Sequence, residues 1–299
     1  MVCPHCSSLY VIKEGIKKTR KAIKQKYMCH SCGRWFSVPL ESRVKDYASN
    51  EIKAGEVFHH QTEEVCRVHC LTDIHVGAKE FDLDKFKEAV NTIASDPQAV
   101  WFGNGDMIEL IPPGYKTIST RGQTVPPEEQ YLSFLQLVAP IRDKCLFIRG
   151  GNHDFLRSYL ILDFDVCKVI AAELGVPYYK YPGYSRIKIK TKKKEIAWNI
   201  VSGHGKSGAK NGDLELDRLA AVYSEGDVFI LGHNHQLYAK PVDSLRIDGD
   251  KEVLHRRWYV RGGSFLMYAD YARYSLYPIV RTGWVTIELS QDGIKCWEN

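Results

Sequence analysis

Short apolar, β-branched or aromatic runs recur from residue 65 onward, and each ends in a cluster of Gly, Asp, Asn or His. Runs of this length that are bounded by turn-forming residues predict buried strands. Each polar cluster would then lie in the loop after a strand, where loops from neighbouring strands can converge on one site. The five clearest runs are residues 65–75, 99–106, 145–154, 196–204 and 227–235.

The segments between these runs place apolar residues at helical spacing. They are residues 83–95, 127–138, 164–174 and 214–224. The alternation of strand and helix predicts an α/β core. Further strand-like runs at residues 186–190, 256–262 and 283–289 predict a second sheet. We therefore expect two packed sheets with flanking helices in one domain, residues 63–299.

The first 38 residues are too few for an apolar core and contain two C-x-x-C pairs. Four thiolates on two turns suit one tetrahedral zinc ion, so we expect a structural zinc site in a zinc ribbon over residues 1–38. The four predicted ligands are Cys3, Cys6, Cys29 and Cys32. Residues 39–62 are polar and without a clear period, which predicts a linker.

The composition, 44% hydrophobic and 26% charged over 299 residues, is typical of a soluble globular protein. No apolar run approaches the about 18 residues that span a bilayer, and the first residues lack the layout of a signal peptide. We therefore expect a cytoplasmic protein with no membrane contact. In that reducing compartment the five cysteines outside the pairs should be small core residues rather than disulfide partners. They are Cys66, Cys70, Cys145, Cys167 and Cys296.

The formal net charge of +5 is unevenly distributed. Residues 1–47 hold ten Lys and Arg against three acidic residues, a surplus of seven, which leaves −2 for the remainder. Cations that crowd around exposed aromatic rings can bind the phosphates and bases of nucleic acid. The alternative is a protein-binding module whose lysines are solvated and whose aromatic residues form its small core. The residues concerned are Lys13, Lys17, Lys18, Arg20, Lys21, Lys24, Lys26 and Arg34, with Tyr10, Tyr27, Trp35 and Phe36.

The clusters after the five strands of the large domain supply two Asp, one Asn and five His of the kinds that bind metals or transfer protons. A pair of divalent ions needs several N and O ligands for each ion and a bridging carboxylate. One Gly-His pair is more often an ordinary turn, but five such clusters in order predict a two-metal site. The residues are Asp73, His75, Asp106, Asn152, His153, His204, His233 and His235.

The same clusters read D-x-H at residues 73–75, G-D at 105–106, G-N-H-D at 151–154, G-H at 203–204 and G-H-x-H at 232–235. In these five ordered motifs the chain resembles the calcineurin-like metallophosphoesterases over residues 65–290. The resemblance implies an α/β fold, a four-layer α-β-β-α sandwich in which two mixed sheets pack between helices. It also places the metal ions at the strand ends.

Carried over residue by residue, the resemblance implies two sets of metal ligands. The first ion would take Asp73, His75 and His235, and the second would take Asn152, His204 and His233. Asp106 would bridge the two. Manganese is the expected metal, with iron or zinc as alternatives, because these N and O ligands accept all three.

The resemblance further assigns catalysis to His153 and Asp154. His153 would face the scissile phosphate as general acid or charge stabiliser, and Asp154 would orient its ring. Water would attack phosphorus in line, without a covalent enzyme intermediate. The protein Ser/Thr phosphatase branch of the family has the motifs G-D-x-V-D-R-G and G-N-H-E. This chain has G-D-M-I-E-L and G-N-H-D at the same places. These differences argue against membership of that branch.

The N-terminal segment is similar to the zinc ribbons of some insertion-sequence transposase proteins, which implies DNA contact. The leading hypothesis is therefore a DNA nuclease whose ribbon docks nucleic acid. A second hypothesis is a phosphatase or phosphodiesterase for small molecules such as nucleotides, with a protein partner on the ribbon. A scaffold that has lost activity is a third, but a scaffold has no need of His153, which is not a metal ligand.

Overall fold

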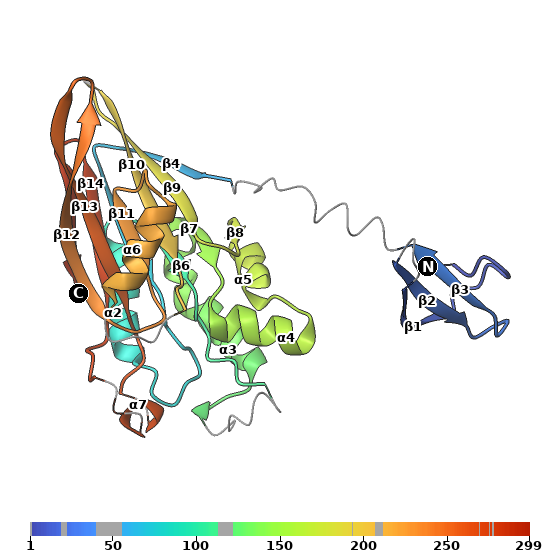
Figure 1. The fold of residues 1–299 in the computed structure, drawn as a ribbon. Coiled ribbons are helices and arrows are strands. Elements are labelled where there is room, and N and C mark those ends of the chain that lie inside the picture. The colour runs from blue at the N-terminus through green and yellow to red at the C-terminus, as the bar shows by residue number, and fades with distance from the viewer. Residues whose placement is uncertain are drawn as a thin grey trace. The chain divides into compact units, whose positions relative to one another are not determined.

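The computed structural model of the chain describes residues 2–18, 23–39, 56–112, 122–192, 194–206, 212–268, 270–274, 276 and 278–299. The chain forms two compact units, residues 1–55 and 56–299 (Figure 1). Within the predicted linker, residues 40–55 lie outside the described residues. Strand β4 (Phe58–Glu63) starts inside that predicted linker and pairs with the sheet of the large unit. The sheet therefore begins a few residues earlier than the sequence indicated.

The small unit is a three-stranded antiparallel sheet of β1 (Val11–Lys18), β2 (Ile23–Cys29) and β3 (Trp35–Pro39). One tight turn precedes β1 and another joins β2 to β3, and each carries a pair of cysteines. Cys3 and Cys29 are buried, whereas the strand residues Ile12 and Ile16 are exposed. The unit therefore depends on its cysteine turns rather than on an apolar core.

The described strands of the large unit form one continuous curled sheet. The halves of this sheet join where β13 pairs with β14 at Gly263 and Ser264. The first half contains β5 (Val65–Leu71), β6 (Ala99–Asn104), β7 (Cys145–Arg149), β8 (Tyr178–Tyr179), β14 (Gly283–Ser290) and β15 (Gly293–Glu298). The second half contains β4, β9 (Gly183–Lys190), β10 (Glu195–Gly203), β11 (Val228–Leu231), β12 (Leu237–Asp248) and β13 (Lys251–Ser264).

The two halves pack face to face. Val68 of β5 and Phe102 of β6 share one buried cluster with Ile200 of β10 and Val260 of β13. Successive residues of a strand point to opposite faces, so β11 turns Ile230 into this cluster and its neighbours outward. The sequence prediction of two packed sheets is confirmed, with the addition that hydrogen bonds between β13 and β14 make them continuous.

Helices α2 (Leu83–Ser95), α3 (Pro127–Val138) and α5 (Val166–Leu174) cover the outer face of one half, and α6 (Asp213–Val222) covers that of the other. The remaining helical elements are α4 (Ser158–Leu162), α7 (Asp270–Tyr274) and a 3-10 turn Ala139–Lys144. Phe86 of α2, Phe134 of α3 and Ile170 of α5 pack in one cluster with Trp101 of β6. On the other side, Leu216 of α6 packs among residues of β10 and β11. The four-layer α-β-β-α order is therefore confirmed.

The five predicted strands and four predicted helices of the large unit are all present. Helix α2 begins where predicted because the Asp82 side chain accepts the backbone N–H of Lys85 at 3.0 Å and so caps it. One element was not predicted. The G-N-H-D cluster, which resembles a loop in sequence, begins a π-helical segment (Asn152–Arg157) that leads directly into α4. Such segments inside helices are frequent at functional sites.

Candidate metal centre

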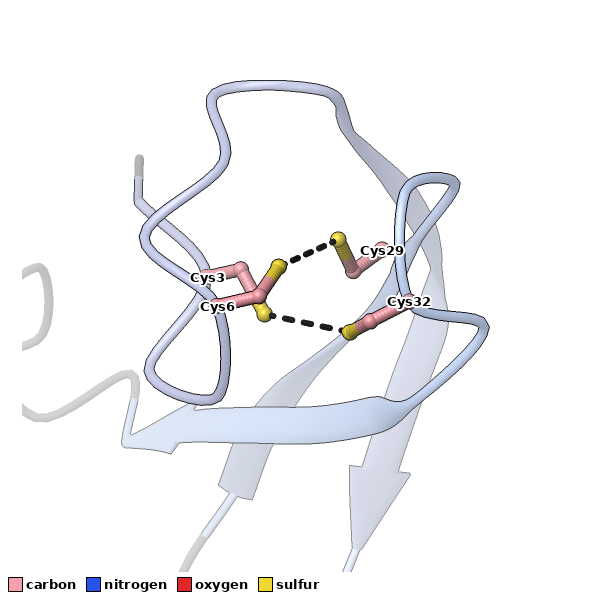
Figure 2. A group of neighbouring side chains, drawn as sticks. All are labelled: Cys3, Cys6, Cys29 and Cys32. Carbon is pink, nitrogen blue, oxygen red and sulfur yellow. Dashed lines mark hydrogen bonds between the residues drawn. The ribbon is translucent and has the colours of Figure 1, made fainter.

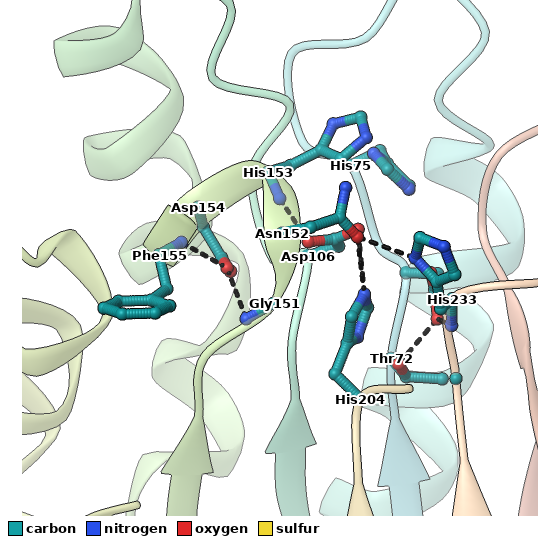
Figure 3. Close-up of polar contacts among 12 residues, drawn as sticks. Thr72, His75, Asp106, Gly151, Asn152, His153, Asp154, Phe155, His204 and His233 are labelled. Carbon is teal, nitrogen blue, oxygen red and sulfur yellow. Dashed lines mark hydrogen bonds and ion pairs between the residues drawn. The ribbon is translucent and has the colours of Figure 1, made fainter. Parts of the chain in front are cut away.

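The seven side chains predicted as metal ligands of the large unit come together at the ends of five strands. Figure 3 shows His75, Asp106, Asn152, His204 and His233 among them. Strands β5, β6 and β7 run parallel to one another, as do β10 and β11, so within each half their carboxyl ends lie at one edge. The ligands follow directly: Asp73 and His75 after β5, Asp106 after β6, Asn152 after β7, His204 after β10, and His233 and His235 after β11. The curled sheet brings the two edges together.

The first group consists of Asp73, His75 and His235, whose ligand atoms all lie within 4.8 Å of one another. Nε2 of His235 is 3.3 Å from Oδ1 of Asp73. Oδ2 of Asp73 accepts the hydroxyl of Thr72 at 2.6 Å and the backbone N–H of His233 at 2.9 Å. These bonds fix the orientation of the carboxylate.

The second group consists of Asp106, His204 and His233, with Asn152 beside them. Nε2 of His204 is 3.1 Å from Oδ2 of Asp106. Oδ1 of Asn152 lies 3.1 Å from Nε2 of His204 and 2.7 Å from Nδ1 of His233. Figure 3 marks both contacts with dashed lines. The amide oxygen and both imidazoles therefore converge on one place.

Five of the seven predicted ligands have positive backbone φ angles between 50° and 68°. For residues other than glycine this left-handed conformation is uncommon and costs about 1 to 3 kcal/mol at each position. Strained backbone of this kind persists where the surrounding structure fixes it, which is typical of functional sites. The five residues are Asp73, His75, Asp106, His233 and His235.

The backbone of the loop after β7 approaches Asp106 so closely that only glycine fits. A Cβ atom on Gly151 would lie 2.1 Å from Oδ1 of Asp106 and 2.3 Å from its backbone nitrogen. Gly105 has a φ of 92°, and a Cβ there would lie 2.4 Å from Nδ1 of His204. The glycines of the G-D and G-N-H-D motifs therefore allow the ligand-bearing loops to meet.

The buried carboxylates are kept ionised by their neighbours. Burial alone would raise the pKa of Asp106, but the imidazoles of His204 and His153 outweigh burial and hold that pKa well below its usual range. Burial would lower the pKa of His204, yet Asp106 and Asp73 raise it to about 10. The ionised carboxylates are thus stabilised by nearby positive charge, which either a proton on His204 or a metal cation supplies.

The residues fit a metal centre by a second observation. Nε2 of His75 is buried and has no hydrogen-bond partner among the described residues, while Nδ1 of the same ring lies 2.8 Å from Oε2 of Glu109. Histidine ligands of metals characteristically bind the metal through one ring nitrogen and a carboxylate or carbonyl through the other.

The family model of the calcineurin-like phosphoesterases matches residues 66–237, more than half of the chain.

The chain belongs to the calcineurin-like phosphoesterase family. It is therefore a metal-dependent phosphoesterase, and its family implies a pair of divalent metal ions. The two groups of ligand-type side chains are the candidate sites for that pair. The sequence resemblance is thereby confirmed.

Several solved structures are similar to this phosphoesterase. They include a conserved uncharacterised protein and predicted phosphoesterase from Streptococcus pneumoniae, with 15% identity over 80% of this chain and 100% of that chain and a TM-score of 0.34. The calcineurin-like phosphoesterase YfkN from Bacillus subtilis shows 13% identity over 79% and 89%, with a TM-score of 0.39. Vacuolar protein sorting 29 from Cryptosporidium parvum shows 13% over 79% and 98%, with a TM-score of 0.40. No curated protein matches the sequence. The family assignment rests on the family model.

The ring of His153 is held by two residues that the sequence did not single out. Its Nδ1 lies 3.2 Å from Oε2 of Glu109 and 3.1 Å from the backbone oxygen of the same residue. Nη2 of Arg157 lies 2.9 Å from Nε2 of His153. Because a guanidinium can only donate, Nε2 accepts here and the N–H at Nδ1 donates to Glu109.

Glu109 connects the predicted acid to a predicted ligand, since the same Oε2 atom contacts both His153 and His75. The carboxylate is almost fully buried, at 8% exposure, and also pairs with Nη1 of Arg157 at 3.3 Å. Burial opposes a charged ring, but Asp106 and Glu109 outweigh it and raise the pKa of His153. The available sequence signal was an acidic residue three positions after Asp106, where the Ser/Thr phosphatase motif also has one.

The orientation of His153 by Asp154, expected from the sequence, is not what the structure shows. Asp154 is fully buried, and its carboxylate accepts backbone N–H groups of Gly151 at 2.8 Å, Phe155 at 2.9 Å and Met107 at 2.7 Å. Figure 3 shows this carboxylate turned toward the loop backbone. Asp154 therefore joins the loop after β7 to the loop after β6, and Glu109 with Arg157 takes the orienting role.

The four cysteines of the small unit form one cluster, as Figure 2 shows. The Sγ atoms of Cys3 and Cys32 are 3.8 Å apart, and those of Cys6 and Cys29 are 3.6 Å apart. Tetrahedral zinc with Zn–S bonds of about 2.3 Å requires S–S separations of about 3.8 Å. The cluster therefore fits a zinc ribbon.

Other sequence expectations concern residues outside these sites. Cys66, Cys70, Cys145 and Cys167 are buried and Cys296 is half-buried, so these thiols act as core residues as predicted. In the part of the chain that the structure describes, no helix is long and apolar enough to cross a membrane. Two of the predicted basic residues, Arg20 and Lys21, lie outside the described residues.

Proposed function

We propose that this phosphoesterase hydrolyses phosphodiester bonds of nucleic acid, with DNA as the polymer, and that its zinc ribbon docks the strand. The observation that carries the proposal is the presence, in one chain, of a phosphoesterase domain with grouped ligand-type side chains and of a basic, aromatic unit whose four cysteines form a cluster that fits zinc. Manganese is the proposed metal of the active site, and one zinc ion is proposed for Cys3, Cys6, Cys29 and Cys32.

The first group would hold one ion and the second group the other, with Asp106 shared between them. When bound, such ions lower the pKa of water and neutralise charge that develops on phosphoryl oxygens. The chain's own contribution is proton transfer and positive charge near the leaving group. Because Nδ1 of His153 is engaged by Glu109, Nε2 is the ring atom left for the leaving oxygen. In this structure Nε2 accepts from Arg157, so it would protonate that oxygen only after Arg157 has turned away and the ring has taken up a second proton. Arg157 places a guanidinium beside that nitrogen.

The ribbon presents the side chains that nucleic acid binding requires. Trp35 is 45% exposed, and Nζ of Lys26 lies 3.9 Å from the centre of its ring. Tyr10 is 75% exposed, and Lys13 and Arg34 are exposed as well. An exposed ring next to cations offers stacking for a base and neutralisation for its phosphate.

A second candidate function has its own supporting observation. Leu9 and Ile16 of the ribbon are largely exposed apolar residues, which favours a protein partner on this unit. In that case the phosphoesterase would act on a small molecule such as a nucleotide.

The two functions differ in their substrates. Purified protein with manganese is tested on single-stranded DNA, duplex DNA, RNA and methyl p-nitrophenyl phosphate, a small chromogenic diester. The nuclease proposal expects cleavage of polymer, and activity on the small diester alone would refute it. Preference for RNA over DNA would move the proposal to ribonucleic acid.

Full-length variants test the role of the ribbon. Replacing Lys13, Lys17 and Arg34 by alanine should weaken binding of duplex DNA and reduce the salt slope by up to about 2.7, since each lost phosphate contact contributes about 0.9. Hydrolysis of the small diester should not change. The matched control replaces Lys87, Lys168 and Lys251, which are exposed on the large unit. An equal effect of both triple variants would contradict docking by the ribbon.

A further inference from the structure

A pocket of about 710 Å³ opens directly beside the second group of ligands. Asn152, His204 and His233 form part of its lining, so a phosphate held at the metal centre would lie at its edge. His153 contacts the first-group residue His75 instead, with ring centres 4.5 Å apart. The leaving oxygen would face His153 and therefore the first group, whereas the pocket lies beside the second group. A substituent that occupies the pocket would therefore remain attached to the phosphorus when the leaving group departs.

The walls of the pocket are largely apolar and partly aromatic. Phe155, Leu156, Tyr181 and Val222 contribute to them. Tyr181 is 70% exposed and Val222 is 75% exposed, so both can be covered by a ligand. Pockets that bind small organic groups have this size and character, with a few polar groups that fix orientation.

Positive charge surrounds these apolar walls. Arg149, Lys180, Lys206 and Arg218 all line the pocket. Its lining also includes one carboxylate, Glu215, which pairs with Arg261 and accepts the backbone N–H of Lys206. The potential inside the pocket therefore favours an anion.

Arg149 supplies a buried part of this charge, with 3% exposure. Its guanidinium donates to Oγ of Ser202 at 2.8 Å, to the backbone oxygen of Gly183 at 3.1 Å and to that of Tyr181, all of them neutral acceptors. These contacts engage each of its three nitrogens but do not neutralise its charge. The contact to Tyr181 also fixes the backbone of that residue, whose ring lines the wall. The buried charge of Arg149 and the aromatic surface of Tyr181 therefore hold each other in place.

Lys180 adds a cation against aromatic rings. Its Nζ lies 4.8 Å from the ring centre of Phe155, 4.9 Å from that of Tyr159 and 5.5 Å from that of Tyr181. All three distances are within the about 6 Å at which a cation is attracted to a ring face. An ammonium among flat rings at the rim suits a ligand that combines a planar group with a phosphate.

We propose that this pocket binds the nucleoside that remains attached to the scissile phosphate, with its base against Tyr181 and Phe155 and an adjoining phosphate near Lys180 and Arg218. The inference rests on the proposed phosphodiesterase function and identifies nucleotides as its substrate class. A purely apolar ligand would leave the cations unused, and a bare phosphate would leave the aromatic walls uncovered.

The test compares two substrates with the same leaving group, thymidine 5′-(p-nitrophenyl) phosphate and methyl p-nitrophenyl phosphate. Full-length wild-type protein should hydrolyse the nucleoside diester with the higher kcat/KM. Tyr181→Ala should reduce kcat/KM for the nucleoside diester at least about fivefold, since base stacking on one aromatic ring corresponds to that factor or more. It should leave the methyl diester unchanged, and Tyr181→Phe should restore the nucleoside preference.

Tyr274, which is 92% exposed on α7, provides the matched control, and Tyr274→Ala should change neither substrate. A second readout is competitive inhibition of methyl diester hydrolysis. Thymidine 5′-monophosphate should inhibit the wild type more strongly than inorganic phosphate, and Tyr181→Ala should remove most of that difference.

The outcomes separate this inference from the proposed function. If the nucleoside confers no advantage in the wild type, or if Tyr181→Ala affects both diesters equally, the pocket does not bind the nucleoside even when DNA is cleaved. If Tyr181 governs the nucleoside diester while no polymer is cut, the pocket inference holds and the nuclease proposal fails.

Discussion

Replacing Glu109 by glutamine probes the residue that links the predicted acid to a predicted metal ligand. The substitution preserves the size of the side chain and removes its charge. Glu109 is almost fully buried and pairs with three partners, His75 at 2.8 Å, His153 at 3.2 Å and Arg157 at 3.3 Å. A neutral amide loses the charge-assisted part of all three contacts.

The size of the effect follows from the contact to His153. A hydrogen bond to a charged group contributes about 1.5 to 3 kcal/mol, and about 1.4 kcal/mol corresponds to a factor of ten in rate. If the hydrogen bond between Glu109 and His153 stabilises the transition state of proton transfer but not the substrate complex, kcat should fall by about 10-fold to 150-fold. Removing a carboxylate behind a histidine ligand also weakens metal binding by about 10-fold to 100-fold, so kcat must be measured at saturating manganese.

The assay is a series of methyl phosphodiesters whose leaving groups range from p-nitrophenol to simple alcohols. An alcohol needs a proton to depart, whereas p-nitrophenolate does not. The ratio of wild-type to Glu109→Gln kcat should therefore rise as the leaving group becomes more basic. Glu252→Gln, at an exposed position of the β12–β13 hairpin, is the matched control and should leave every ratio near one.

Metal content by mass spectrometry and the thermal unfolding midpoint accompany these rates. A loss of kcat that is the same for every leaving group would refute the role of Glu109 in holding His153 as an acid. A Glu109→Gln variant that cannot be saturated with metal would show instead that the main role of Glu109 is to hold the predicted metal ligand His75.

Three further predictions concern single residues. His153→Asn should lower kcat by about 10²-fold to 10⁴-fold and leave two ions bound in the large unit, and loss of metal would show that His153 is a ligand. Gly151→Ala should reduce metal content and activity, because its Cβ would lie 2.1 Å from Oδ1 of Asp106, while Gly122→Ala, where the nearest atom is 3.4 Å away, should not. Cys29→Ser should remove one zinc ion and weaken polymer cleavage but preserve hydrolysis of the small diester, and unchanged zinc content would contradict the four-thiolate site.

The sequence by itself determined the elements and the order of the chemistry. Buried strands such as β5 and β11 appear as short apolar runs, and α2 appears as a helical period that ends where predicted. Because a ligand one or two residues beyond a strand must lie at the strand's end, local spacing placed Asp73 and His233 at strand ends, and the resemblance in the five ordered motifs assigned them to one site.

Only the tertiary structure decided which side chains touch. Glu109 and His153 are 44 residues apart and belong to loops after different strands, so their contact depends on how β6 and β7 pair and on the helical turn that starts at Asn152. The same holds for Asp154, whose neighbours in space proved to be backbone amides rather than the ring beside it in sequence. Periodicity is a local property of the chain, whereas hydrogen-bond partners across loops depend on backbone angles, including the positive φ at five ligands, that no spacing of residues specifies.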